Sequence, residues 1–357
     1  MRAEIQAAAR AATFFLKVLP MLPSRPIDWV TRTPVIEHVR YPTRAGDVAG
    51  ELYRPPGPGP HPGMLVCLGV VPFEVDHPQV PILGRALARS GFAALLFWSP
   101  AMRSFRLDPG DVEDIVSAYR WLTDRADIDA TRSGLLRTCV GGSFALMAAT
   151  RPLIRDRVAF VTEWAAYSSM WTFAQDIASA TRVVGATRRP WRVDPLTRKV
   201  YVHSMTALLA PPEAALLRER MAERSGSVDR DALSEPARAI YPLLTALDPD
   251  GAARALKELP AALRERIDAL SPVNTVRDIQ APLIALAHDR DDNVVPIDES
   301  RRLAAALSGR PGVHYTELGM FEHMDPTARR ASPLVMIREL AKFYGLVYPV
   351  FRQAVAG

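Results

Sequence analysis

The sequence predicts an α/β protein with a mostly parallel central sheet, flanking helices and an inserted helical cap. Strand-like and helix-like stretches alternate through the first half of the 357-residue chain, which is typical of a parallel sheet covered by helices. From about Trp171 to Ala269, charged helical segments punctuated by proline replace this alternation. The alternation resumes at Pro282. One α/β domain that carries an insertion reaches this chain length.

The elements before the insertion are predicted from apolar periodicity and from the turn residues between them. The run 64–69 is apolar and bounded by glycines, so we expect a buried strand. The helix 81–90 ends before Gly91, and the helix 111–126 has acids in its first turn and one apolar face. The predicted strands are 35–41, 48–53, 64–69, 92–97, 133–138 and 157–162, and a third helix is 141–150.

After the insertion, the pattern predicts strands 282–287 and 313–318 and helices 298–307 and 332–343. We therefore divide the chain into an N-terminal amphipathic helix (1–30), a first core part (31–170), a helical cap (171–270) and a second core part (271–357). The helix expected from Arg2 to Leu22 is predicted to pack on the core, and peripheral membrane contact is the alternative.

Composition and charge indicate which partners and which cellular compartment to expect. The net charge is +5, but arginines stand beside acids, as in Arg218-Glu219-Arg220, so we expect a solvated surface and no nucleic-acid partner. The two cysteines, the lack of a signal-peptide pattern and the lack of a long apolar run favour the cytoplasm. The sequence contains no metal-ligand spacing and no phosphate loop, so we expect no metal and no cofactor.

Cys139 stands where a strand runs into a helix. The apolar run before it leads to Thr138-Cys139-Val140-Gly141-Gly142, and the glycines open the next helix. A tight strand-to-helix turn exposes a side chain at the carboxyl edge of a sheet, and the helix N-terminus favours a thiolate there. The pattern predicts a nucleophilic cysteine, and the alternative is a small buried apolar residue at a strand end.

This stretch resembles the nucleophile elbow of α/β-hydrolases, in the cysteine form found in dienelactone hydrolases and polyhydroxyalkanoate synthases. Arg137 departs from the family pattern, which has glycine two residues before the nucleophile. The resemblance implies two backbone donors for an oxyanion. These are the N–H of Val140 and that of Val70, which follows Leu68-Gly69.

In this family the acid and the histidine follow the nucleophile in the chain. Asp292 stands four residues before Pro296 after a predicted strand, and this spacing is similar to that of the family acid. Asp291 is the alternative, and Asp289 is expected to serve the loop itself. His323 lies in a loop after the next strand and is the expected base.

Two other histidines are less well placed than His323. His314 lies within a predicted strand and His288 within the acid loop.

The predicted function is hydrolysis of an ester, lactone or thioester through an acyl-cysteine. A thiolate is a good leaving group, so activated carbonyls of small molecules are the expected substrates. Aromatic residues of the cap, among them Trp171 and Trp191, are candidates for an apolar pocket and equally for the core of the cap. Two alternatives stay open: an acyltransferase of the same fold, and a non-catalytic binding protein, which the departure at Arg137 leaves open.

Overall fold

The fold was analysed in a computed structural model that describes residues 1–19, 25–70, 77–222, 226–319, 321, 323 and 332–355, except the side chains of 25 and 26. Eight strands form one sheet in the order β1-β2-β4-β3-β5-β6-β9-β10. Strands β1 and β2 are antiparallel to their neighbours, and the other six strands are parallel. The strands are β1 (Val35–Thr43), β2 (Gly46–Arg54), β3 (His61–Cys67), β4 (Ala93–Phe97), β5 (Ile128–Thr138), β6 (Phe160–Trp164), β9 (Leu283–Asp289) and β10 (Val313–Leu318).

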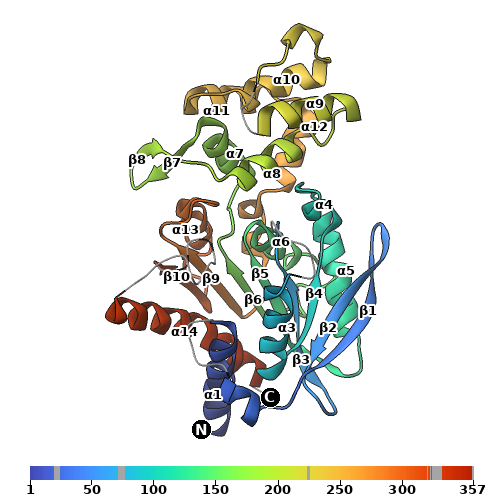
Figure 1. The fold of residues 1–357 in the computed structure, drawn as a ribbon, viewed down its shortest axis with the longest axis vertical. Helices are drawn as coiled ribbons and strands as arrows, with labels where there is room; N and C mark the ends of the chain where they lie inside the picture. Colours follow the sequence, from blue (N-terminus) through green and yellow to red (C-terminus); the bar gives the residue numbers. More distant parts are fainter. Residues whose placement is uncertain are drawn as a thin grey trace.

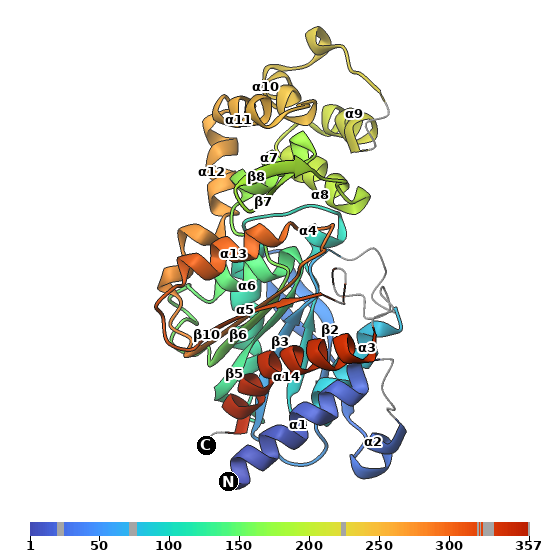
Figure 2. The ribbon, with the colours of Figure 1, turned by 90° about the vertical axis from the view of Figure 1, so that its left-hand side faces the viewer.

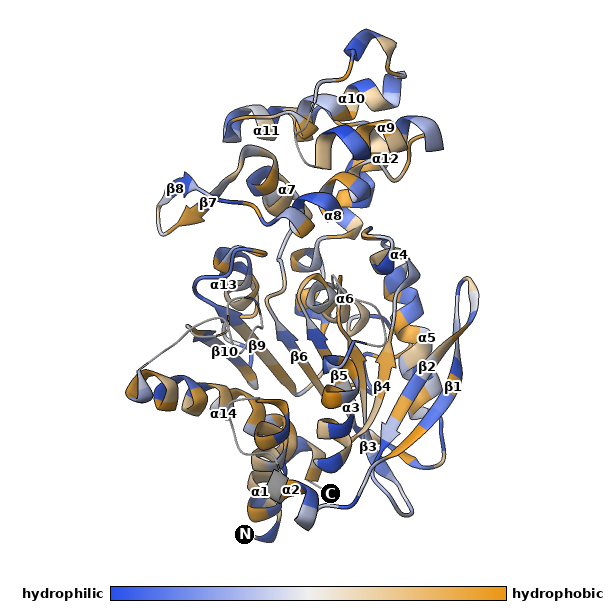
Figure 3. Cartoon of the chain, in the orientation of Figure 1, coloured by the Kyte–Doolittle hydropathy of each residue, from blue (hydrophilic) through white to orange (hydrophobic). Residues whose placement is uncertain are grey.

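Helices cover both faces of this sheet (Figures 1 and 2). One face packs against α5, α6 and α13, and the other against α1, α3 and α14. Figure 3 shows β4 and β9 as mostly hydrophobic, which agrees with their burial on both faces. The core helices are α1 (Arg2–Val18), α2 (Arg25–Val30), α3 (Gln79–Arg89), α4 (Pro100–Arg103), α5 (Asp111–Thr123), α6 (Val140–Ala148), α13 (Ile297–Ala306) and α14 (Pro333–Val355).

The segment between β6 and β9 stands above the carboxyl edge of the sheet (Figure 1). It consists of helices and a two-stranded hairpin, β7–β8, which the sequence analysis missed because its strands are short and largely exposed. Its elements are α7 (Met170–Ser179), β7 (Thr181–Val184), β8 (Thr187–Pro190), α8 (Pro195–Met205), α9 (Pro211–Ala222), the 3₁₀ turn Arg230–Ala232, α10 (Glu235–Leu244), α11 (Pro249–Lys257) and α12 (Ala261–Ala269). We call this segment the cap.

The chain enters and leaves the cap at one place. The N–H of Val273 donates to the carbonyl oxygen of Ser168 at 2.9 Å, and the N–H of Met170 donates to Ser271 Oγ at 2.9 Å. The buried carboxylate of Glu299 on α13 accepts hydrogen bonds from the backbone N–H and the hydroxyl of Ser168. The two crossings are therefore bonded to each other and to the core.

The terminal helices pack on the core together. Helix α1 buries Ala7, Ala11, Phe14 and Phe15 against α14 and α3. The predicted packing of this helix on the core is thus confirmed, although it ends at Val18 and the expected residues 20–22 lie outside the described residues. No helix within the described ranges is long and apolar enough to cross a membrane.

Two predicted helix ends were wrong, by twelve residues and by three. The last helix was expected to end at Phe343 but continues past Pro349 to Val355, because its apolar face packs against α1 and the sheet. The helix that starts at Asp111 ends at Thr123 rather than Ala126.

Candidate active site

Cys139 occupies the turn between β5 and α6 with φ 57° and ψ −148°. This backbone region is costly for a residue with a side chain and occurs mainly where the fold imposes it. The Cys139 N–H donates to the carbonyl oxygen of Trp164 at 2.7 Å, and the Cys139 carbonyl accepts from Gly142 at 2.8 Å. The strained conformation is therefore held from both sides, as expected for an elbow.

The loop after β3 lies against this elbow. A methyl group added at Gly69, which has φ 74°, would lie 2.8 Å from the carbonyl oxygen of Thr138 and 3.3 Å from Cys139 Cβ. The Thr138 hydroxyl donates to the carbonyl oxygen of Leu68 at 3.0 Å. The backbone at Val70, the next residue, is thereby brought close to Cys139.

The two expected oxyanion donors are available for a ligand. Among the residues that the structure describes, neither the N–H of Val70 nor that of Val140 donates a hydrogen bond. Val140 is the first residue of α6, where a helix leaves its N–H groups without intrahelical acceptors. These two groups remain the candidate oxyanion hole.

His323 and Asp292 are brought together as expected. Nδ1 of His323 lies 2.7 Å from Oδ2 of Asp292, and the His323 side chain is also hydrogen-bonded to Cys139. Oδ1 of Asp292 accepts from the backbone N–H groups of Val294 at 2.7 Å and Val295 at 2.9 Å. The three expected catalytic side chains thus form one hydrogen-bonded chain.

The side chains of this hydrogen-bonded group shift one another's pKa values. Burial alone would lower the pKa of His323, but the Asp292 carboxylate and the Cys139 thiolate together raise it well above its usual value. Burial alone would raise the pKa of Asp292, but His323, His288 and the Val295 N–H hold it below its usual value. The arrangement favours a protonated His323 ring beside the Asp292 carboxylate.

Asp289 forms hydrogen bonds with the loops around it. Its Oδ1 accepts from the N–H of Asp291 at 3.0 Å, as expected for a loop residue. Its Oδ2 accepts from the N–H of Phe321 at 2.7 Å, and this bond ties the histidine loop to the acid loop. Phe321 packs edge-on against Trp164, so the segment that carries His323 is anchored two residues before it.

His288 was wrongly placed in the acid loop, because it belongs to β9 and is fully buried behind Asp292. Burial lowers its pKa, although the Asp292 carboxylate opposes this shift. Its Nε2 lies 2.9 Å from the carbonyl oxygen of Val295 and 3.5 Å from Asp292 Oδ2, and Nδ1 lies 2.6 Å from Ser300 Oγ. His288 therefore lies beside Asp292 and contacts the backbone of Val295, an arrangement that sequence spacing did not reveal.

Arg137 does not crowd the elbow. Its side chain is fully buried and turns over the ring of Phe97, with 5.5 Å from Cζ to the ring centroid. None of its guanidinium nitrogens has a hydrogen-bond partner among the described residues. Burial lowers its pKa, although the electrostatic effects of Cys67 and Asp111 oppose this shift.

The cap aromatics have separate positions. Trp171 donates to Asp268 Oδ1 at 2.7 Å and so joins α7 to α12. Trp191 is buried, and its indole N–H has no partner within the described part of the chain. Neither observation assigns these two residues to a substrate pocket.

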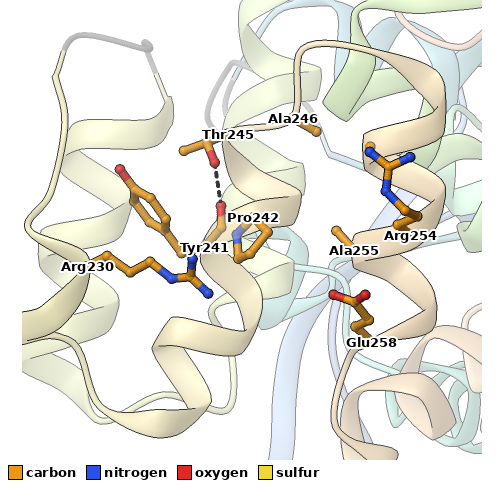
Figure 4. A pocket seen from close by; sticks show the side chains of 9 residues that line it. Arg230, Tyr241, Pro242, Thr245, Ala246, Arg254, Ala255 and Glu258 are labelled. Atoms are coloured by element: carbon orange, nitrogen blue, oxygen red, sulfur yellow. Dashed lines mark hydrogen bonds between the residues drawn. The ribbon is translucent and has the colours of Figure 1, made fainter.

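A hollow of about 350 Å³ lies in the outer part of the cap, between α10 and α11 (Figure 4). It is lined by Arg230, Tyr241, Arg254 and Glu258, among others. It contains none of the residues of the Cys139 site, so we do not assign the reaction to it.

Comparison with known proteins agrees with the fold. No protein-family model matches the chain. A curated protein from a Bradyrhizobium species, a probable 2-oxo-3-(5-oxofuran-2-ylidene)propanoate lactonase, is 31% identical over 145 residues, which is 36% of this chain and 57% of that protein. The chain thus spans less than two thirds of the length of this curated relative.

Two solved structures resemble nearly the whole chain. The 2,6-dihydroxy-pseudo-oxynicotine hydrolase has a TM-score of 0.55 and 16% identity, over 98% of this chain and 80% of its own. An acylaminoacyl peptidase of Pyrococcus horikoshii has a TM-score of 0.55 and 13% identity, over 92% of this chain and 43% of its own. The chain therefore has the α/β-hydrolase fold.

Proposed function

We propose that the protein is an α/β-hydrolase that cleaves carboxylic esters, lactones or thioesters of small molecules through an acyl-cysteine intermediate. The observation that carries this proposal is the chain of hydrogen bonds from Cys139 through His323 to Asp292 at a strained strand-to-helix turn. The similarity to a probable lactonase and the cysteine at the elbow, as in dienelactone hydrolases, favour lactones and other activated carbonyls.

The proposed reaction has two halves. The Cys139 thiolate attacks the carbonyl carbon, and the resulting oxyanion accepts hydrogen bonds from the N–H groups of Val70 and Val140. When the carbonyl re-forms, the carbon–oxygen or carbon–sulfur bond to the leaving group breaks, and His323 gives the leaving group a proton. His323 then takes a proton from water, whose oxygen attacks the acyl carbon, and the bond to sulfur breaks with return of the thiolate.

Asp292 orients the His323 ring during this cycle. Its carboxylate keeps the His323 ring turned with Nε2 toward Cys139, and it stabilises the imidazolium that exists before acylation and forms again during deacylation. A reducing compartment such as the cytoplasm would keep Cys139 in the required thiol state.

The test is turnover of 4-nitrophenyl esters and of a simple enol lactone, α-angelica lactone, by wild type, Cys139→Ala and Cys139→Ser. We expect Cys139→Ala to lose at least about a thousandfold in kcat/KM, because both halves of the reaction use the sulfur. Intact-protein mass spectrometry of wild type during turnover should show the mass of one added acyl group. Equal activity of wild type and Cys139→Ala would refute the proposal.

The same experiment separates hydrolysis from acyl transfer. Added ethanol or glycerol competes with water for the acyl-cysteine. Partition mainly to the acid identifies a hydrolase, whereas partition mainly to the new ester identifies an acyltransferase.

A further inference from the structure

Tyr167 carries a buried hydroxyl group that bonds to none of the described residues. The residue is 0% exposed, and its hydroxyl has no hydrogen-bond partner among the residues that the structure describes. By contrast, the hydroxyl of the buried Tyr119 donates toward two carbonyl oxygens, of Ser133 at 2.9 Å and of Arg157 at 3.0 Å. An unpaired buried hydroxyl costs about 1–3 kcal/mol of stability, so its presence calls for a reason outside the fold.

The position of Tyr167 is rigid. Its N–H donates to Ser143 Oγ at 3.0 Å, and the Ser143 hydroxyl donates back to the Tyr167 carbonyl oxygen at 2.8 Å. Ser143 lies on α6, the helix that begins at the elbow. The Tyr167 ring stacks on Phe173 of α7, with centroids 5.4 Å apart and planes 14° from parallel. The ring is thus fixed between the elbow helix and the first cap helix.

Tyr167 also lies within electrostatic reach of the nucleophile. Burial raises the pKa of its phenol, and the charges of Glu299 and Cys139 raise it further. The hydroxyl therefore keeps its proton and is a neutral hydrogen-bond donor. The backbone of Tyr167 is bonded to Ser143, which stands four residues after Cys139 on α6.

The strand order indicates on which side of Cys139 the Tyr167 segment lies. The elbow follows β5, whose two neighbours in the sheet are β3 and β6. Val70, a candidate oxyanion donor, follows β3, whereas Tyr167 follows β6. The segments that carry these two donors therefore leave the sheet on opposite sides of β5, so we expect the donors to address different atoms of a substrate.

We propose that the Tyr167 hydroxyl is a substrate-positioning group that donates a hydrogen bond to an acceptor oxygen on the acyl part of the substrate. The inference rests on the proposed function and narrows its substrates to acyl groups that carry a second oxygen besides the reacting carbonyl, such as a keto, ether or carboxylate oxygen. A site with a buried unpaired donor discriminates strongly against an analogue that lacks the matching acceptor.

The test compares two esters that differ at one carbon, 4-nitrophenyl 4-oxopentanoate and 4-nitrophenyl pentanoate. Wild type should prefer the oxo ester. Tyr167→Phe should lose about 10- to 100-fold in kcat/KM on the oxo ester and less than about threefold on the pentanoate. Because Tyr167→Phe removes an unpaired hydroxyl, the melting temperature of this variant should equal or exceed that of wild type.

Tyr119→Phe is the matched control, since it removes a hydroxyl that is bonded far from the elbow. It should lower the melting temperature and leave the ratio of the two kcat/KM values unchanged. If Tyr167→Phe leaves that ratio unchanged while turnover still requires Cys139, the inference fails and the proposed function stands. If wild type turns over neither ester, or if Cys139→Ala retains activity, the proposed function fails and the inference fails with it.

Discussion

Arg182 of the cap hairpin donates a hydrogen bond from Nη1 to the carbonyl oxygen of Asp292, at 3.2 Å. The cap therefore contacts the main chain of the residue whose carboxylate orients His323. The contact makes the acid loop a point where movement of the cap would reach the proposed catalytic groups.

Replacement of Arg182 should disturb the acid loop without removing a reacting group. We expect Arg182→Ala to lower kcat by about three- to tenfold, because misplacement of an orienting group weakens catalysis, and to increase hydrogen exchange in residues 290–296. Arg189→Ala is the control, since Arg189 is exposed and pairs with Arg182 across the hairpin. Equal effects of the two substitutions would show that only the charge of the hairpin matters.

Asp292→Asn should keep the loop and lose most of the activity. An amide oxygen can still accept from Val294 and Val295, but an amide N–H facing Nδ1 of His323 would favour the wrong tautomer. We expect kcat to fall by roughly 10²- to 10⁴-fold, measured with 4-nitrophenyl pentanoate. Asp291→Asn should retain wild-type kcat; a comparable loss there would transfer the role to Asp291.

Arg137→Met should raise the free energy of unfolding. The arginine is buried without a hydrogen-bond partner among the described residues, and a methionine of similar length would pack on Phe97 without a charge. Replacement of a buried charge by a well-packed apolar side chain stabilises proteins by about 1–4 kcal/mol in favourable cases. Urea unfolding measures the difference, and Arg137→Gly should destabilise by leaving a cavity. A large loss of stability in Arg137→Met would contradict this account of the site.

Glu163 should make the fold less stable as the pH rises. Burial raises the pKa of its carboxyl to about 8, whereas a glutamate in an unfolded chain titrates near about 4.3. Between these values the folded state holds a proton that the unfolded state has released, so the free energy of unfolding falls as the pH rises toward 8. Glu163→Gln preserves an acceptor for the Ala166 N–H and cannot ionise. Its melting temperature should change less than that of wild type between pH 5 and pH 8; parallel curves would exclude Glu163 as the cause.

The sequence predicted the parts of the site that depend on chain order. Cys139, Asp292 and His323 each follow a strand in the order that the α/β-hydrolase fold imposes, so local patterns were enough to propose them as the site residues. Central strands of the sheet such as β4 were predicted because they are continuous apolar runs.

The parts that depend on packing could not be predicted. The predicted strand stopped one residue before His288, so His288 was assigned to the loop. Every residue of β9 is buried, and a strand without alternating polar residues gives no sign of where it ends. The unpaired hydroxyl of Tyr167 and the direction of the Arg137 side chain depend on neighbours that are distant in the sequence. No spacing rule encodes such contacts.

The bonded crossings at Ser168–Val273 and Met170–Ser271 make the cap an exchangeable module. The core ends at these crossings are already adjacent, and the cost of closing a loop grows only slowly with its length, by about 0.6 kcal/mol for each doubling. A short turn or a different cap could therefore join the same two ends while β5, α6 and the acid loop keep their places. Substrate range could diverge among descendants of such a chain by replacement of the cap, with the chemistry inherited unchanged.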